Sequence, residues 1–246
     1  TRNLIGQIAC ARATLALTRY DPQTMRAQAL RALEYLPADN LTFLFTANWA
    51  LASACLLQGD RAGAARACQE TVAISQKSPS VFSKILAASM LGNLQKLDNQ
   101  LPQAAVTYRR VLELAGEHPH PNVGGVQLSL AQIYYEWNDL DGAERHGELS
   151  LELTRQFDLL IDRFIISEVF LAHLKLARGE GAGAAALLAA TEHSARQQHF
   201  TARLPEIAAE QVRVLLQQGQ VAAAAQLAWQ YELPLSRARV LIAQND

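Results

Sequence analysis

The sequence predicts an all-α protein made of repeated helical hairpins. Alanine and leucine dominate, and runs that alternate between apolar and polar residues, as in strands, are missing. A small residue also recurs four positions after a turn of Gly or Asn followed by a polar residue. These marker alanines, separated by 40, 39, 41 and 40 positions, are Ala64, Ala104, Ala143, Ala184 and Ala224. Such a period predicts an α-solenoid, here a right-handed superhelix.

The stretch 126–154 shows the repeat unit most clearly. Its first half is apolar at helical spacing, and Asn138-Asp139 then breaks the helix. The second half carries a narrow seam of small residues at Ala143, Gly147 and Ser150. Because small residues let the bulky side chains of a partner approach, we expect the two helices to pack antiparallel.

The other units repeat this arrangement along the chain. The turns that precede the markers are Gly59-Asp60, Asn99-Gln100, Asn138-Asp139, Gly179-Glu180 and Gly219-Gln220. Asp21-Pro22 indicates an earlier turn, since Asp at the N-cap and Pro at the first helical position start a helix. The expected hairpins cover residues 4–36, 41–76, 81–115, 123–156, 159–198 and 204–231.

Two features define the expected domain. The prolines in the linker 116–122 are expected to exclude helix, which makes it the clearest break between hairpins. Residues 235–246 resemble the first helix of a seventh hairpin, truncated at its own turn, without the polar capping helix of a solenoid end. We therefore expect residues 1–246 to be a single repeat domain and a fragment of a longer protein.

Composition excludes several classes of protein. The formal net charge is −1, and no stripe of Lys and Arg is present, which argues against direct binding of nucleic acid. No apolar run reaches the length of about 18 residues that a membrane span needs, and no signal peptide is recognisable. Cys10, Cys55 and Cys68 are odd in number and lack ligand spacing, as expected of reduced thiols in the cytoplasm.

A polar position recurs eleven residues before each marker. The side chains there are Ser53, Asn93, Gln132, His173 and Arg213, within otherwise apolar helices. Trp49, Lys96 and Tyr135 lie on the same helix face, four residues before or three after this position. We expect these eight residues to line a concave groove that binds an effector. The alternative is that the polar ones are solvated and that Trp49 packs between repeats.

Signals for catalysis, metal or cofactors are missing. The chain has no H-E-x-x-H and no Cys-x-x-Cys, and the glycine-rich stretch 179–183 lacks the lysine of a phosphate loop. His118 and His120 have no carboxylate or Cys at ligand spacing nearby, so we expect no metal site. The sequence therefore predicts a protein that binds and is not an enzyme.

Leu91-Gly92 and the later aromatic Tyr108 match the tetratricopeptide pattern, although these helices exceed its unit of about 34 residues. The repeat pattern resembles the sensor domain of MalT-like, LuxR-type bacterial transcription activators of the signal-transduction ATPase class. The segments that carry this resemblance include LAQIYYEWNDLDGAERHGELSLEL and LSRARVLIAQND. The resemblance implies a cytoplasmic parent with an upstream ATPase domain, which binds ATP, and a C-terminal DNA-binding helix-turn-helix. This fragment itself would hold no cofactor.

Two functions follow from the resemblance. In the first, the superhelix senses an inducer, transmits the signal to the parent's ATPase and DNA-binding domains, and binds a small molecule or a regulatory protein in its groove. In the second, it is a protein-interaction scaffold that binds an extended peptide or a partner's helix. Only Lys96 and Arg213 supply basic groups along the aligned positions, so a carboxylate clamp for peptide ends is less expected.

Overall fold

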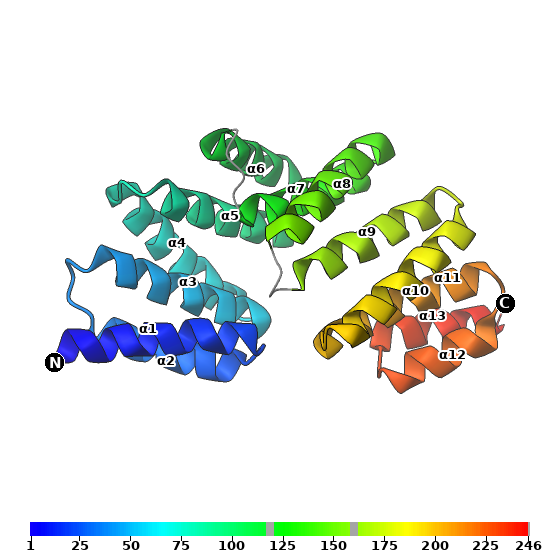
Figure 1. Cartoon of the computed structure of the whole chain (residues 1–246), viewed down its shortest axis with the longest axis horizontal. Coiled ribbons are helices and arrows are strands. Elements are labelled where there is room, and N and C mark those ends of the chain that lie inside the picture. The colour runs from blue at the N-terminus through cyan, green and yellow to red at the C-terminus, as the bar shows by residue number, and fades with distance from the viewer. Residues whose placement is uncertain (117–120, 158–161, 246) are drawn as a thin grey trace. The chain divides into compact units, whose positions relative to one another are not determined.

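The computed structural model describes residues 1–116, 121–157 and 162–245 (Figure 1). Within these residues every regular element is helical, which confirms the all-α prediction. The helices are α1 (Arg2–Thr18), α2 (Pro22–Tyr35), α3 (Leu41–Leu57), α4 (Arg61–Lys77), α5 (Val81–Leu97), α6 (Leu101–Ala115), α7 (Pro121–Glu136), α8 (Leu140–Phe157), α9 (Arg163–Ala177), α10 (Gly181–Gln197), the short 3-10 helix η1 (Thr201–Arg203), α11 (Leu204–Gln217), α12 (Val221–Gln230) and α13 (Pro234–Asn245).

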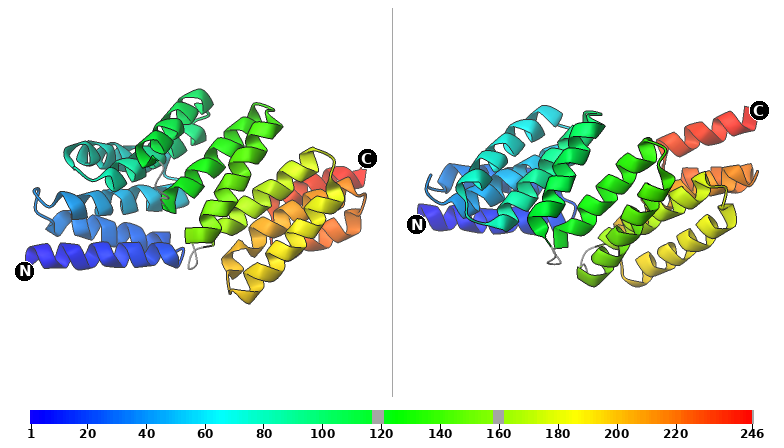
Figure 2. Two further views of the ribbon diagram at one scale, coloured as in Figure 1. Left: turned by 45° about the horizontal axis from the view of Figure 1, so that its top comes forward. Right: turned by 90° about the horizontal axis from the view of Figure 1, so that it is seen from above.

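The chain divides into two compact units, residues 1–122 and 123–246. Unit 1 contains the hairpins α1–α2, α3–α4 and α5–α6. Unit 2 contains α9–α10 and α11–α12, preceded by α7 and α8 and followed by α13. Figure 2 shows the paired helices of each unit side by side. That residues 1–246 form a single domain stays a prediction.

Backbone geometry explains why the helices end where the sequence predicts. The first residue of each predicted turn has a left-handed conformation, with φ of 75° at Gly59, 58° at Asn99 and Asn138, 81° at Gly179 and 73° at Gly219. This conformation suits Gly and Asn, and it ends a helix. The next residue starts the following helix: the Asp60 carboxylate, for example, accepts a hydrogen bond of 2.8 Å from the Gly63 amide.

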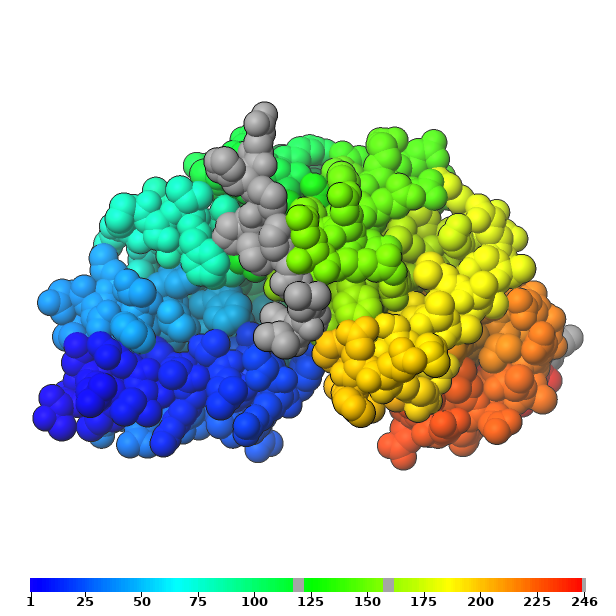
Figure 3. Space-filling model, viewed as in Figure 1, coloured from blue at the N-terminus to red at the C-terminus, as the bar shows by residue number. Residues whose placement is uncertain are grey.

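The marker alanines form the seam between helices. All five are fully buried. Gly92 and Tyr108 show how closely the helices of a hairpin approach, since a Cβ added at Gly92 would lie 2.5 Å from the Tyr108 ring. In unit 1, α2 also packs on α3 and α4 on α5, and Figure 3 shows side chains filling the space between these hairpins. The hydrophobic core is therefore a series of clusters between successive helices.

The linker 116–122 corrects one expectation. Helix α7 begins at Pro121, so Pro121 and Asn122 are helical although proline was expected to exclude helix there. The reason is that proline is tolerated in the first turn of a helix, where its missing N–H has no intrahelical acceptor. The expected start of the fifth hairpin, residues 159–161, lies outside the described residues, and α9 begins at Arg163. None of the helices described here is long and apolar enough to cross a membrane.

Candidate functional site

Three of the predicted binding residues come together in unit 2. Tyr135 of α7, His173 of α9 and Arg213 of α11 belong to three consecutive repeats. The Tyr135 and His173 ring centroids lie 4.8 Å apart, edge to face, and Arg213 Nη1 lies 2.9 Å from His173 Nδ1. We call these residues, together with Glu210 of α11, the unit 2 cluster.

Glu210 holds the cluster together. Its side chain is 10% exposed, and its Oε1 lies 2.7 Å from His173 Nδ1. Its other oxygen lies 3.6 Å from Arg213 Nε, one turn further along α11. Because a guanidinium only donates hydrogen bonds, the His173 nitrogen that pairs with Arg213 Nη1 must be an acceptor, and Nδ1 lies 2.9 Å and Nε2 3.5 Å from that atom.

The unit 2 cluster is accessible from one side. The His173 side chain is 20% exposed and that of Arg213 34% exposed, and the Phe170 ring packs edge to face against Tyr135. The site therefore offers an aromatic edge and an imidazole beside one guanidinium donor and one carboxylate acceptor. Since the polar groups already pair with one another, a ligand must replace these bonds with its own, which favours specificity over affinity.

Gln132 and the unit 1 residues have other surroundings. Gln132 is partly buried and lies on α7 one turn before Tyr135, on the same helix face. Trp49 packs against two apolar clusters that join α1 to α5, so it contributes to packing between repeats. The Ser53 hydroxyl donates to the Trp49 carbonyl at 2.9 Å, and the Asn93 Oδ1 accepts from the Tyr108 hydroxyl at 2.7 Å. The Ser53 hydroxyl and the Asn93 amide are therefore each hydrogen-bonded within their own repeat.

Lys96 is the remaining predicted site residue. It lies near the C-terminal end of α5 and is partly buried. Burial lowers the pKa of its amine to about 8, because the charged form loses its hydration. At neutral pH the charged form of the amine is therefore favoured by much less than in an exposed lysine.

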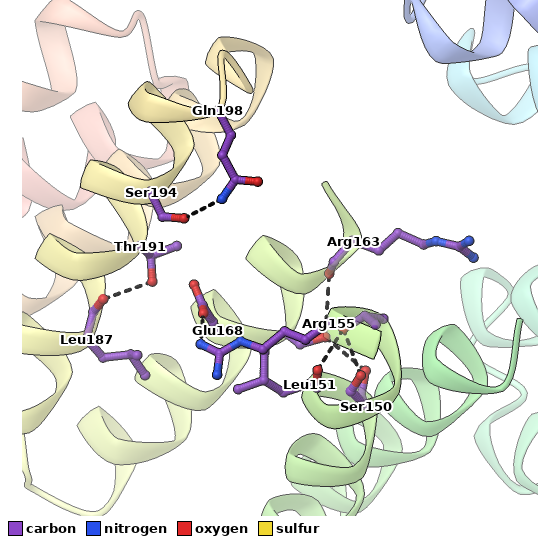
Figure 4. A network of polar contacts seen from close by, with 11 residues as sticks. Ser150, Leu151, Arg155, Arg163, Glu168, Leu187, Thr191, Ser194 and Gln198 are labelled. Atoms are coloured by element: carbon purple, nitrogen blue, oxygen red, sulfur yellow. Dashed lines mark hydrogen bonds and ion pairs between the residues drawn. The ribbon is translucent and has the colours of Figure 1, made fainter. Parts of the chain in front are cut away.

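Sequence reasoning missed a second group of polar residues in unit 2. Figure 4 shows the Arg155 guanidinium of α8 against the buried carboxylate of Glu168 on α9. Nearby, the buried hydroxyls of Ser150 and Ser167 lie 2.9 Å apart. The signal for this network was present, since Glu168 is the single acidic residue of the mainly apolar helix α9.

Side chains that could hold a metal ion are not grouped in the described part of the chain. No group of three or more His, Cys, Asp or Glu side chains there is arranged to hold a metal ion. His118 and His120 lie outside the described residues. The absence of catalysis stays a prediction.

Comparisons with known proteins identify the family of this chain and solved structures with a similar fold. A family model described as the MalT-like TPR region matches residues 6–245. No match was found among the curated proteins. Similar solved structures include a Rap protein complexed with competence and sporulation factor, which has a TM-score of 0.76 and 13% identity over 100% of this chain and 76% of the other.

Two further solved structures share the helical-repeat fold. NprR in complex with its cognate peptide NprX has a TM-score of 0.65 and 13% identity, over 97% of this chain and 71% of that one. A signal transduction ATPase with numerous domains from Pyrococcus horikoshii, described as having a tetratricopeptide repeat sensor, has a TM-score of 0.65 and 15% identity over 97% of this chain. This chain spans 39% of the length of that protein.

Proposed function

Because this chain belongs to the family of MalT-like TPR regions, we propose that it is the inducer-sensing, signal-transducing domain of a bacterial LuxR-type transcription activator. It acts by binding a small effector or a regulatory protein and has no catalytic activity or cofactor of its own. ATP and DNA bind to other domains of the parent, which is cytoplasmic. The observation that carries the proposal is the unit 2 cluster, in which three repeats contribute to one polar, partly exposed site.

The location of the cluster suits a sensor. A ligand held by α7, α9 and α11 contacts three repeats at once, so its affinity depends on how those repeats are spaced. A ligand shifts a conformational equilibrium only through its differential affinity for the two states. An effector bound to the unit 2 cluster therefore favours one spacing of the repeats and transmits binding as a change of shape.

A second candidate is a protein-interaction scaffold. Two of the similar structures are described as complexes with a peptide or a factor, at 13% identity in both cases. The aromatic edge of Tyr135 and the paired charges of Glu210 and Arg213 suit a peptide with polar side chains as well as a small molecule. Sensing and peptide binding are compatible within one site.

A thermal-shift screen tests the site. Ligands that bind the folded state raise the melting temperature by mass action, so sugars, sugar phosphates, amino acids, organic acids and a peptide library are screened on the whole chain. For any hit, Arg213→Ala and His173→Ala should weaken binding by about tenfold or more, since each removes a polar partner of the ligand.

The controls separate binding from folding. His193 of α10 and Arg110 of α6 are exposed, so His193→Ala and Arg110→Ala make the same changes away from the cluster. Both control variants should bind the ligand with the same affinity as the unsubstituted chain. Unchanged affinity in His173→Ala and Arg213→Ala, measured by calorimetry below their melting temperatures, would rule out the unit 2 cluster as the effector site.

A further inference from the structure

A groove of about 580 Å³ lies on unit 1, between α2, α3 and α4. Its lining includes Asn48, Leu51 and Cys55 of α3, Arg26 of α2 and Arg66 of α4. Small-molecule sites have volumes of about 300–1,000 Å³, so the groove is large enough for a small ligand.

The groove differs from the one that the sequence predicts. Asn48, Leu51 and Cys55 are spaced three and four residues apart and so share one face of α3. The predicted groove residues Trp49 and Ser53 occupy another face of the same helix. No role in the proposed sensor site therefore accounts for the α2–α4 groove.

Arg26 is held in place across the groove. Its Nη1 donates to Gln58 Oε1 at 3.1 Å and lies 3.3 Å from Asp60 Oδ2, so the turn between α3 and α4 fixes the guanidinium. Nη1 makes both contacts, which leaves the donors of Nε and Nη2 for other partners.

Arg66 faces the same end of the groove. Both Arg26 and Arg66 act electrostatically on the Asp60 carboxylate, and both oppose the effect of burial that raises the pKa of the Cys55 thiol. Arg66 makes no ion pair or hydrogen bond with any residue that the structure describes. The two guanidiniums thus place positive charge around Cys55 and Asp60, and Asp60 offsets part of it.

Neither arginine position is occupied by arginine throughout the repeats. The position of Arg26, directly after Met25, is occupied by alanine in four other repeats: Ala65, Ala105, Ala185 and Ala225. The position of Arg66 is occupied by Ala27, Val106 and Ala186 in three other repeats, and by Arg145 and Gln226 in the remaining two. Most repeats have alanine or valine at these positions, so stacking of the helices does not by itself require an arginine at either one.

We propose that the α2–α4 groove binds a small organic anion, whose acidic group pairs with Arg26 and Arg66 and whose apolar part lies on Leu30 and Leu51. A guanidinium fork matches the geometry of a carboxylate or a phosphate. Both leucines line the groove, where Leu30 is half exposed and Leu51 is partly buried. Glu70, one turn beyond Arg66, also lines the groove and disfavours a ligand with a second negative charge.

Titrations of the whole chain with hexanoate, acetate and inorganic phosphate test this proposal. Two-dimensional NMR of the arginine Nε–Hε groups at constant ionic strength reports directly on the two guanidiniums. We expect saturable shifts of both with hexanoate, and weaker binding of acetate, which lacks the apolar chain. Phosphate separates recognition of any oxyanion from preference for a carboxylate: saturation by phosphate as tight as by hexanoate would refute the role of Leu30 and Leu51.

Variants decide whether the groove is responsible. Arg66→Ala should weaken hexanoate binding by about tenfold or more with little change in melting temperature, because Arg66 supports no other contact. Arg110→Ala is the matched control and should bind like the parent chain. Linear, non-saturating shifts, equal weakening in both variants, or binding of an acidic peptide without any small anion would each overturn the proposal.

Discussion

At the scale of single residues, Lys96 links burial to pH. Its pKa is lowered by burial to about 8 from an ordinary value of 10.5. Between these two pH values the unfolded chain binds more protons at Lys96 than the folded chain does. The contribution of Lys96 to the free energy of unfolding therefore rises with pH through this window, and below about pH 8 its unfavourable effect is fully present.

Lys96→Met removes the buried charge and tests this dependence. The variant should be more stable than the parent chain at pH 7, and the gap between the two should narrow as the pH rises toward 10. Urea denaturation at several pH values measures the gap. The buried thiols, which oppose the trend at high pH, are common to both proteins and cancel in the difference. A gap that is constant from pH 7 to 10 would contradict the assignment.

The unit 2 cluster shows which site residues a sequence can reveal. His173 and Arg213 were predicted because a polar residue recurs eleven positions before every marker. Glu210, which binds both of them, lies three positions earlier, where other repeats have Ala50, Met90, Ser129 and Phe170. That position shows no recurring polarity, so alignment of the repeats could not find Glu210. Only the packing of α9 on α11 brings the carboxylate to the histidine.

At the scale of elements, left-handed turn residues set the length of each helix. Nothing lies within 4 Å of a Cβ added at Gly219, which has a φ of 73°. Gly219→Ala should therefore destabilise the chain only through backbone strain, by about 1 kcal/mol. Gly125, inside α7, is equally open but helical, so Gly125→Ala should stabilise by up to about 1 kcal/mol.

Urea denaturation of these two variants provides the measurement. The same chemical change is expected to have opposite signs at the two positions, because only Gly219 has a positive φ. Destabilisation by both substitutions, or by neither, would show that turn conformation does not limit the helices.

Helix boundaries were predictable because local chemistry determines them. Helices end at turn residues with positive φ and begin at capping carboxylates such as Asp60 and Asp139. Both signals act within a few residues, so the sequence alone reveals them. The prediction that Pro121 excludes helix was wrong because proline can begin a helix as well as end one. Which role it takes depends on the conformation of the preceding residues, and composition alone does not encode that.

At the scale of the whole molecule, most packing is local. The hydrophobic clusters join helices that are neighbours along the chain, such as α1–α3, α3–α5 and α7–α9. A repeat period therefore predicts the fold class, because each hairpin buries its seam against adjacent ones. The division into residues 1–122 and 123–246 falls at the end of the linker 116–122, which the sequence indicated as the clearest break between hairpins but not as a boundary between units.

Because packing is local, a destabilising substitution should affect mainly the unit that contains it. Gly92→Ala forces the buried Tyr108 ring to move, which should destabilise unit 1 by about 1–3 kcal/mol. Hydrogen exchange followed by mass spectrometry should then show faster exchange in residues 81–115, with protection of α11 and α12 unchanged. Uniformly faster exchange along the chain would instead indicate one cooperative structure. Gly125→Ala serves as the reference, since its added methyl meets no neighbouring atom.

The burial of all three cysteines also makes the chain suitable for spectroscopic labelling. Cys10 and Cys68 have pKa values raised by burial to about 11, and Cys55 is equally enclosed. Since maleimides and methanethiosulfonates react with the exposed thiolate, the native side chains remain largely unmodified. Cysteines introduced at surface positions, one in residues 1–116 and one in residues 162–245, therefore accept paired spin or fluorescent labels in an otherwise native background. Distances between such labels, with and without an effector, report directly on how this chain responds to its ligand.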